Sequence, residues 1–195
     1  MKQLLSIILT ALLLIPSAKA QEDLQKGATP WGEKRTFTTI KENPITSVKN
    51  QYRSGTCWDY GTIGFFESEI LRKTGKSYDL CEMFVANRDY MDCAAHYVRM
   101  HGYSHFSQGG SCDDVLEVIR RYGICPEEAM PAPGSLVGDV AANFREFIPE
   151  LEQMVSRIAL KDAKAPMPHW QDSVLNIIEK YIGHCPESFE YKDNT

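Results

Sequence analysis

The chain has 195 residues, of which 43% are hydrophobic and 24% are charged, as is usual for a globular protein of one domain. Its formal net charge of −5 argues against nucleic-acid binding, because nucleic-acid-binding proteins usually present a basic surface. The six cysteines form no C-x-x-C pair, so no structural zinc site is evident. We also expect no other metal and no cofactor.

The first twenty residues have the three parts of a signal peptide. Lys2 supplies a positive charge, residues 4–16 are apolar, and residues 18–20 read Ala-Lys-Ala, which fits a cleavage site. The apolar part is too short to span a membrane. We therefore expect residues 1–20 to be removed, the mature chain to have no membrane span, and the protein to be periplasmic or secreted.

A cysteine follows a short glycine-containing loop and begins a predicted helix. Residues 21–43 are polar and predict an irregular lead-in, and residues 44–51 predict a short extended segment. Cys57 then precedes a helix expected over residues 58–73. Backbone N–H groups at a helix N-terminus are unpaired and favour a thiolate, which is the nucleophilic form of cysteine. The amide of Gln51 and the N–H of Cys57 can together hold an oxyanion.

Two features of this segment leave alternatives open. A free cysteine is most often a small buried hydrophobic residue, so Cys57 can also be structural. Asp59 lies two residues further on, where its charge would raise the pKa of the thiol if the two side chains face each other and would matter little if Asp59 points into solvent.

In the expected helix, Glu67 and Glu69 are predicted on an exposed flank, and the apolar residues at helical spacing are predicted core: Ile63, Phe65, Phe66, Ile70 and Leu71.

Two further helices are expected over residues 80–99 and 111–122. The buried stripe of the first is predicted to consist of Tyr90, Met91, Ala94, Tyr97 and Val98. Gly109 and Gly110 precede the second helix, and adjacent glycines permit the close approach of another backbone. The alternative is that they form an ordinary turn.

The last third of the chain also predicts helices, over residues 140–160 and 170–182, after a linker at residues 132–138 that is rich in Pro, Gly and Ser. Pro149 is expected to set a boundary or a kink in the first of them. The sequence as a whole therefore predicts a mainly α fold.

The segment around the cysteine resembles the nucleophile motif of papain-like cysteine peptidases. Gln51 precedes Ser-Gly-Thr-Cys-Trp at residues 54–58, a variant similar to the bleomycin hydrolase and aminopeptidase C branch. The resemblance implies peptide-bond hydrolysis, with Cys57 as the nucleophile and Gln51 in the oxyanion hole. Trp58 is implied to belong to the substrate site.

The same resemblance extends over most of the chain. Gly109 and Gly110 resemble the glycine pair whose backbone binds an extended peptide substrate. Residues 44–131 resemble the helical left half-domain, and residues 132–195 resemble the start of a helical insertion. The β-rich right half-domain, which carries the catalytic His and Asn, is then absent. We expect a truncated chain with weak or no activity, and homo-oligomers are possible by analogy with the branch.

Three readings remain open at this stage. The first is an aminopeptidase-like cysteine peptidase, and the second is a non-catalytic relative that binds peptides. The third is a helical structural protein stabilised by disulfides, although the spacing of the cysteines assigns no pairing. His184 is not predicted as the catalytic base, because it lies in a helix end and turn rather than on a strand.

Overall fold

The structure is a computed structural model that describes residues 38–130, 142–160 and 168–191. Residues 1–42 and residues 43–195 form two separate units, and every helix of the described ranges belongs to the second. The predicted signal peptide at residues 1–20 and the predicted linker at residues 132–138 lie outside the described residues.

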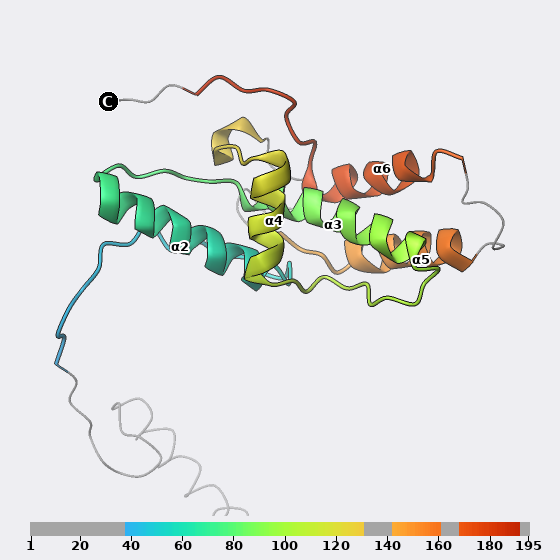
Figure 1. Cartoon of the computed structure of the whole chain (residues 1–195), viewed down its shortest axis with the longest axis horizontal. Helices are drawn as coiled ribbons and strands as arrows, with labels where there is room; N and C mark the ends of the chain where they lie inside the picture. The colour runs from blue at the N-terminus through green and yellow to red at the C-terminus, as the bar shows by residue number, and fades with distance from the viewer. Residues whose placement is uncertain (1–37, 131–141, 161–167, 192–195) are drawn as a thin grey trace, which may run out of the picture. The chain divides into compact units, whose positions relative to one another are not determined.

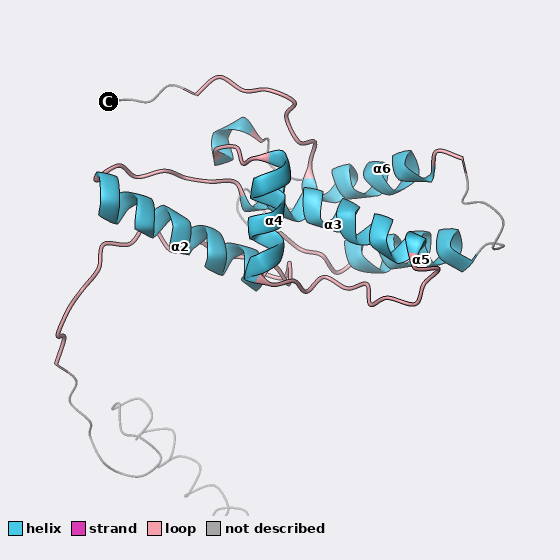
Figure 2. Cartoon of the chain, viewed as in Figure 1, coloured by secondary structure: helices cyan, strands magenta, loops and turns pink. Residues whose placement is uncertain are grey.

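The described part of the chain is helical and holds two isolated β-bridges but no strand, so the predicted mainly α fold is confirmed (Figures 1 and 2). Within these same ranges, no helix combines the length and the apolar composition that crossing a membrane requires. The elements are α2 (Cys57–Thr74), α3 (Glu82–Arg99), α4 (Cys112–Tyr122), a 3-10 turn (Glu127–Ala129), α5 (Phe147–Leu160) and α6 (Trp170–Ile182).

The helix predicted over residues 140–160 begins later than expected, at Phe147. Residues just before it pair with the loop that leads to Cys57. The N–H of Arg53 donates to the carbonyl of Ala142 at 3.1 Å, and the N–H of Phe144 donates to the carbonyl of Arg53 at 3.1 Å. Pro149 falls in the first turn of α5, where a missing N–H costs no intrahelical hydrogen bond. It therefore marks the start of the helix and not a kink.

An aromatic cluster joins α3, α5 and α6, which contact one another (Figure 1). The ring of Tyr90 on α3 lies edge-on to that of Phe147 on α5, with their centroids 5.4 Å apart. Phe144 and Tyr181 contact Phe147 from two further directions. Full burial of a side chain such as Phe147 contributes about 1.5–3 kcal/mol to folding. This cluster gives the loops around Cys57 a rigid base.

The predicted buried stripe of α3 is confirmed at Tyr90, Ala94 and Val98. On α2 the prediction was partly wrong. Phe65 was expected in the core but is 61% exposed, and Glu67 was expected on the surface but is buried. The chain segment before the Cys57 loop explains Glu67, because it supplies polar partners that the periodicity of the helix alone cannot reveal.

Candidate active site

Cys57 is the first residue of α2, as predicted to within one residue, and its side chain is exposed. The carbonyl of Thr56 accepts hydrogen bonds from the N–H groups of Asp59 and Tyr60, both at 3.0 Å. These bonds close the first turn and fix the direction in which the Cys57 side chain leaves the helix. The N–H of Cys57 itself belongs to the part of a helix that has no intrahelical acceptor.

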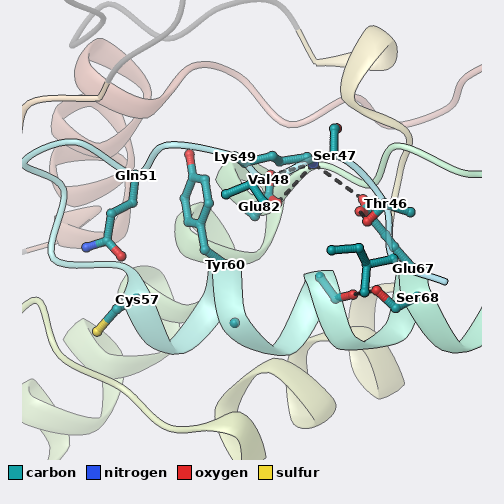
Figure 3. A pocket seen from close by; sticks show the side chains of 13 residues that line it. Thr46, Ser47, Val48, Lys49, Gln51, Cys57, Tyr60, Glu67, Ser68 and Glu82 are labelled. Carbon is teal, nitrogen blue, oxygen red and sulfur yellow. Dashed lines mark hydrogen bonds and ion pairs between the residues drawn. The ribbon is translucent and has the colours of Figure 1, made fainter. Parts of the chain in front are cut away.

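A groove of about 370 Å³ runs from Cys57 along α2 (Figure 3). Gln51 and Cys57 lie together at one end of it, and Lys49 lies with its carboxylate partners toward the other. The predicted nucleophile and the predicted oxyanion donor therefore share one surface. The complete lining is Ile45, Thr46, Ser47, Val48, Lys49, Gln51, Cys57, Tyr60, Gly61, Gly64, Glu67, Ser68 and Glu82.

The loop between Gln51 and Cys57 is a tight turn. The carbonyl of Gln51 accepts hydrogen bonds from the N–H of Ser54 at 3.3 Å and from its hydroxyl at 2.8 Å. Gly55 has a φ of +65°, in the left-handed region that favours glycine, and a Cβ there would lie 2.4 Å from the side chain of Gln108. The loop is thus shaped by its own hydrogen bonds and by close packing against a second loop.

That second loop carries the predicted glycine pair. The carbonyl of Gln108 accepts two hydrogen bonds, from the indole N–H of Trp58 at 3.2 Å and from the hydroxyl of Tyr90 at 3.1 Å. A Cβ on Gly110 would lie 2.7 Å from the Trp58 ring, whereas one on Gly109 would meet the hydroxyl of Ser107 at an ordinary 3.7 Å. The structure therefore places Gly110 against the ring of the residue that follows Cys57.

Trp58 itself is 9% exposed, so most of its ring supports the glycine loop from beneath. Two of the roles that sequence reasoning missed belong to Gln108 and Tyr90. The carbonyl of Gln108 has no signature in the sequence, because every residue has one. Tyr90 was predicted as core, and the role of its hydroxyl depends on a residue 18 positions away.

Asp59 lies on the buried side of α2 and is not among the described residues that line the groove. Neither of its carboxyl oxygens has a hydrogen-bond partner. Burial raises the pKa of Asp59 well above its usual range, and the charges of Glu82 and Asp89 raise it further. Both causes favour the protonated, uncharged carboxyl over the carboxylate. The sequence left open whether Asp59 faces the Cys57 thiol or solvent. The structure shows a third arrangement, because Asp59 faces neither solvent nor the groove that holds Cys57.

Lys49 is the centre of a cluster of carboxylates. Its ammonium group lies 3.3 Å from Glu67, 2.7 Å from Asp79 and 2.9 Å from Glu82. It also donates to the carbonyl of Leu80 at 2.9 Å. Burial opposes the charge of Lys49, but the hydrogen bond to Asp79 and the charge of Glu82 outweigh it and raise its pKa above the usual range. Because Lys49 is two residues before Gln51, the cluster anchors the segment that carries the predicted oxyanion donor.

Two carboxylates of the cluster, those of Glu67 and Glu82, are buried, whereas the side chain of Asp79 is 68% exposed. Glu67 also accepts from the N–H of Leu80 at 2.7 Å and from the hydroxyl of Thr46 at 2.9 Å. Burial raises the pKa of Glu82 to about 7, and the positive charge of Lys49 opposes this shift. No local pattern in the sequence indicates the cluster, since it joins residues 13 to 33 positions apart.

No histidine is among the described residues that line the groove. His184 follows α6, where its Nδ1 lies 2.6 Å from the carboxylate of Glu179 and its side chain is 72% exposed. This contact gives His184 a partner at its own helix end. The geometry agrees with leaving His184 out of the predicted catalytic set.

Comparison with known proteins identifies the family. Residues 33–156 match the model of the papain family cysteine proteases. Pro-cathepsin H from Bos taurus is 31% identical over 78% of this chain and 39% of its own length. A cathepsin L-like protein from Caenorhabditis elegans is 33% identical over 46% of this chain and 24% of its own length.

A viral cathepsin from Choristoneura fumiferana nuclear polyhedrosis virus is 25% identical over 66% of this chain and 36% of its own length. The chain thus spans less than half of the length of each of these relatives. The matched residues include the Cys57 loop, α2, α3 and α4, which form the candidate site. The chain belongs to the papain family of cysteine proteases.

Proposed function

We propose that the chain carries the nucleophile of a cysteine peptidase that hydrolyses peptide bonds. The sulfur of Cys57 attacks the scissile carbonyl carbon, and the side-chain amide of Gln51 and the N–H of Cys57 donate to the developing oxyanion. One observation carries this proposal: an exposed thiol at a helix N-terminus shares a groove with a glutamine amide.

The substrate in this proposal is an extended peptide. Gly109 and Gly110 are exposed, and the absence of side chains leaves their backbone open to pair with a peptide strand. Trp58 fixes their position through its contact with Gly110 and its hydrogen bond to Gln108. Within the papain family, we propose aminopeptidase action of the bleomycin hydrolase type, in an exported, periplasmic or secreted protein.

The proton of the Cys57 thiol requires a base, which in this proposal is a histidine outside the described lining of the groove. Loss of the base from such a catalytic unit lowers the rate by several orders of magnitude. We therefore expect the 195-residue chain alone to hydrolyse fluorogenic peptides weakly or not at all. Substantial turnover that disappears in Cys57→Ala would contradict this expectation about the base and would support the nucleophile.

A thiol-reactive peptidyl epoxide tests the nucleophile directly. Cys112 is a matched internal control, because it is also exposed and is also the first residue of a helix, α4. We expect the epoxide to label Cys57 at least about tenfold faster than Cys112, since only Cys57 lies beside an oxyanion donor and a peptide site. Equal labelling, measured by peptide mass spectrometry, would remove the assignment of Cys57.

The second candidate function is a non-catalytic module that binds peptides. The absence of a histidine from the described lining of the groove favours it. In this case a substrate peptide binds equally well to the chain and to Cys57→Ala, and the epoxide labels Cys57 no faster than Cys112. Binding measured by calorimetry together with the labelling ratio separates the two functions.

A further inference from the structure

Three buried cysteines lie outside the groove. Cys81 and Cys125 are each 1% exposed and Cys185 is 4% exposed, and all three belong to the same core cluster. None of them lines the groove that holds Cys57, and the proposed peptidase mechanism does not use them. All three are thiols in the structure.

Cys81 and Cys125 are opposite each other in a short antiparallel pairing. Leu80 and Pro126 form an isolated antiparallel bridge, and the N–H of Cys81 donates to the carbonyl of Cys125 at 3.0 Å. On the other side of the bridge, the N–H of Glu127 donates to the carbonyl of Asp79 at 2.9 Å. This pattern places Cys81 directly across from Cys125.

The spacing of such a pair suits a disulfide. In antiparallel pairings, opposite residues that are linked by a hydrogen bond have Cα atoms about 5.5 Å apart and side chains on the same face. Disulfides bridge Cα atoms about 4.4–6.8 Å apart, most often near 5.5–6 Å. The backbone at Cys81 and Cys125 therefore needs no large movement to accept a covalent bond between the two sulfurs.

The two thiols already contact each other. A hydrogen bond from the Cys81 thiol lowers the pKa of Cys125, and the same contact together with burial raises the pKa of Cys81. The two sulfurs are therefore near neighbours, as a disulfide requires.

We propose that Cys81 and Cys125 form a disulfide that closes residues 81–125 into a loop when the chain folds in the presence of a small-molecule disulfide. The thiolate of one of the two cysteines attacks one sulfur of the reagent and releases one small thiol. The other cysteine then loses its proton to solvent and attacks the sulfur of the first, which releases the second small thiol. Two electrons pass from the protein to the reagent, and one S–S bond replaces another.

The bond would act on the candidate site through the residues next to it. Leu80 and Glu82 flank Cys81, and both are partners of Lys49. Lys49 in turn anchors the segment that ends at Gln51. A disulfide at Cys81 therefore restrains Leu80 and Glu82, which hold Lys49 at one end of the groove. The formation of the disulfide does not depend on the chemistry of Cys57.

Cys185 is the competitor for this pairing. Its thiol donates to the carbonyl of Phe84 at 3.9 Å, and its pKa is raised to about 11 by burial and by the nearby Cys125. Cys185 reaches the cluster from the segment after α6, and no backbone hydrogen bond aligns it with Cys125 among the described residues. It is thus a matched control, equally buried in the same core but outside the antiparallel pairing.

Peptide mapping tests the proposal. The full chain is unfolded, reduced and refolded in a glutathione redox buffer, and free thiols are then alkylated under denaturing, non-reducing conditions. We expect a mass lower by two hydrogens than that of the reduced chain before alkylation, and one cross-linked peptide pair that contains Cys81 and Cys125. A cross-link between Cys125 and Cys185, or complete alkylation of all six cysteines, would overturn the proposal.

Thermal unfolding gives an independent measurement. Closing a loop of this length restricts the unfolded chain, so we expect oxidation to raise the Tm by about 10 °C, reversibly with a phosphine reductant. Cys185→Ala should keep both the cross-link and the shift, and Cys81→Ala should lose both. An equal shift in Cys81→Ala, or no shift in the cross-linked wild-type chain, would show that the pair does not stabilise the fold. If Cys81→Ala fails to fold, the cross-link map of the wild-type chain still decides the pairing.

Discussion

The two ends of the groove along α2 are built in different ways. At one end, Cys57 and Gln51 are held by neutral contacts: backbone hydrogen bonds within a tight loop, and glycines that permit close packing on Trp58 and Gln108. At the other end, a single described lysine, Lys49, is held by ion pairs with several carboxylates. The first end depends on shape, and the second depends on charge.

This difference separates reactivity from stability. Asp59, two residues after Cys57, lies on the buried side of α2 and outside the described lining of the groove, and its burial favours the uncharged carboxyl. We therefore expect changes at the charged end to alter mainly the free energy of unfolding. Changes at the neutral end should alter mainly the binding of peptides and the labelling of Cys57.

The largest effect is expected for Lys49→Met, which breaks the charged end. Removing one partner of a buried ion pair leaves carboxylates without compensation and costs about 3–5 kcal/mol. The free energy of unfolding should fall by that amount at pH 7.5, as measured by urea denaturation. At pH 5 the loss should be smaller, because Glu82, whose pKa is raised to about 7, is then protonated.

The matched control is Lys73→Met. Lys73 is 64% exposed and pairs with Glu69 at 3.7 Å on the surface of α2. Such a pair contributes less than about 1 kcal/mol, so this variant should unfold almost as the wild-type chain does. Equal losses in the two variants would show that the Lys49 cluster is not a buried ionic support.

The second expected effect is a dependence of stability on pH. Burial raises the pKa of Glu82 and of Asp89 to about 7 in the folded chain, against about 4 in an unfolded one. Between pH 4 and pH 7 the folded state therefore binds more protons than the unfolded state, and this proton binding stabilises the fold. The stabilisation is complete below the pKa of the unfolded chain and is lost as the pH rises through the pKa of the folded chain.

From pH 5 to pH 8, each of the two carboxyls should lower the free energy of unfolding by on the order of 3 kcal/mol. Asp89→Asn should flatten this dependence, while Glu69→Gln on the exposed side of α2 should leave it unchanged. Urea denaturation at a series of pH values measures both. A stability that rises with pH over this range would contradict the buried, protonated carboxyls.

Much of the fold could be predicted from the sequence. The periodicity of apolar residues located α2, α3, α4 and α6 to within two residues, because helix ends are also marked by local residues such as Gly75 and Gly123. The predicted start of α5 was wrong because the side chain of Phe144 continues the apolar periodicity of the helix, whereas its backbone pairs with that of Arg53. A local pattern cannot report a partner that lies far away in the chain.

The residues of the candidate site likewise fall into those that a local motif indicates and those whose position depends on distant parts of the chain. Cys57, Gln51 and the glycine pair form local motifs, and the structure places Cys57 and Gln51 in one groove and Gly110 against Trp58. Glu67 was misplaced on the surface, because its burial depends on Thr46 and Lys49 in a segment without periodicity. The charged end of the groove was therefore invisible in the sequence, while the neutral end could be proposed from it.

Gly110→Ala tests whether the neutral end depends on shape. Its Cβ would lie 2.7 Å from the Trp58 ring, so the glycine loop or the ring must move, at a cost of about 1–3 kcal/mol. We expect slower labelling of Cys57 by the peptidyl epoxide and a lower Tm. Gly109→Ala is the adjacent control, since a Cβ there meets Ser107 at an ordinary 3.7 Å and should leave the Tm nearly unchanged.

The smallest effect is expected for Tyr90→Phe, which removes one hydroxyl and keeps the ring in the aromatic cluster. The carbonyl of Gln108 then loses the 3.1 Å hydrogen bond from Tyr90 and keeps the 3.2 Å bond from Trp58. Loss of one such bond costs about 1 kcal/mol, so the Tm should fall by a few degrees. Because Gln108 directly precedes the glycine pair, labelling of Cys57 by the peptidyl epoxide should slow severalfold, while labelling by a small reagent such as iodoacetamide stays constant. If both reagents slow equally, Tyr90 supports the Cys57 loop itself and not the peptide site beside it.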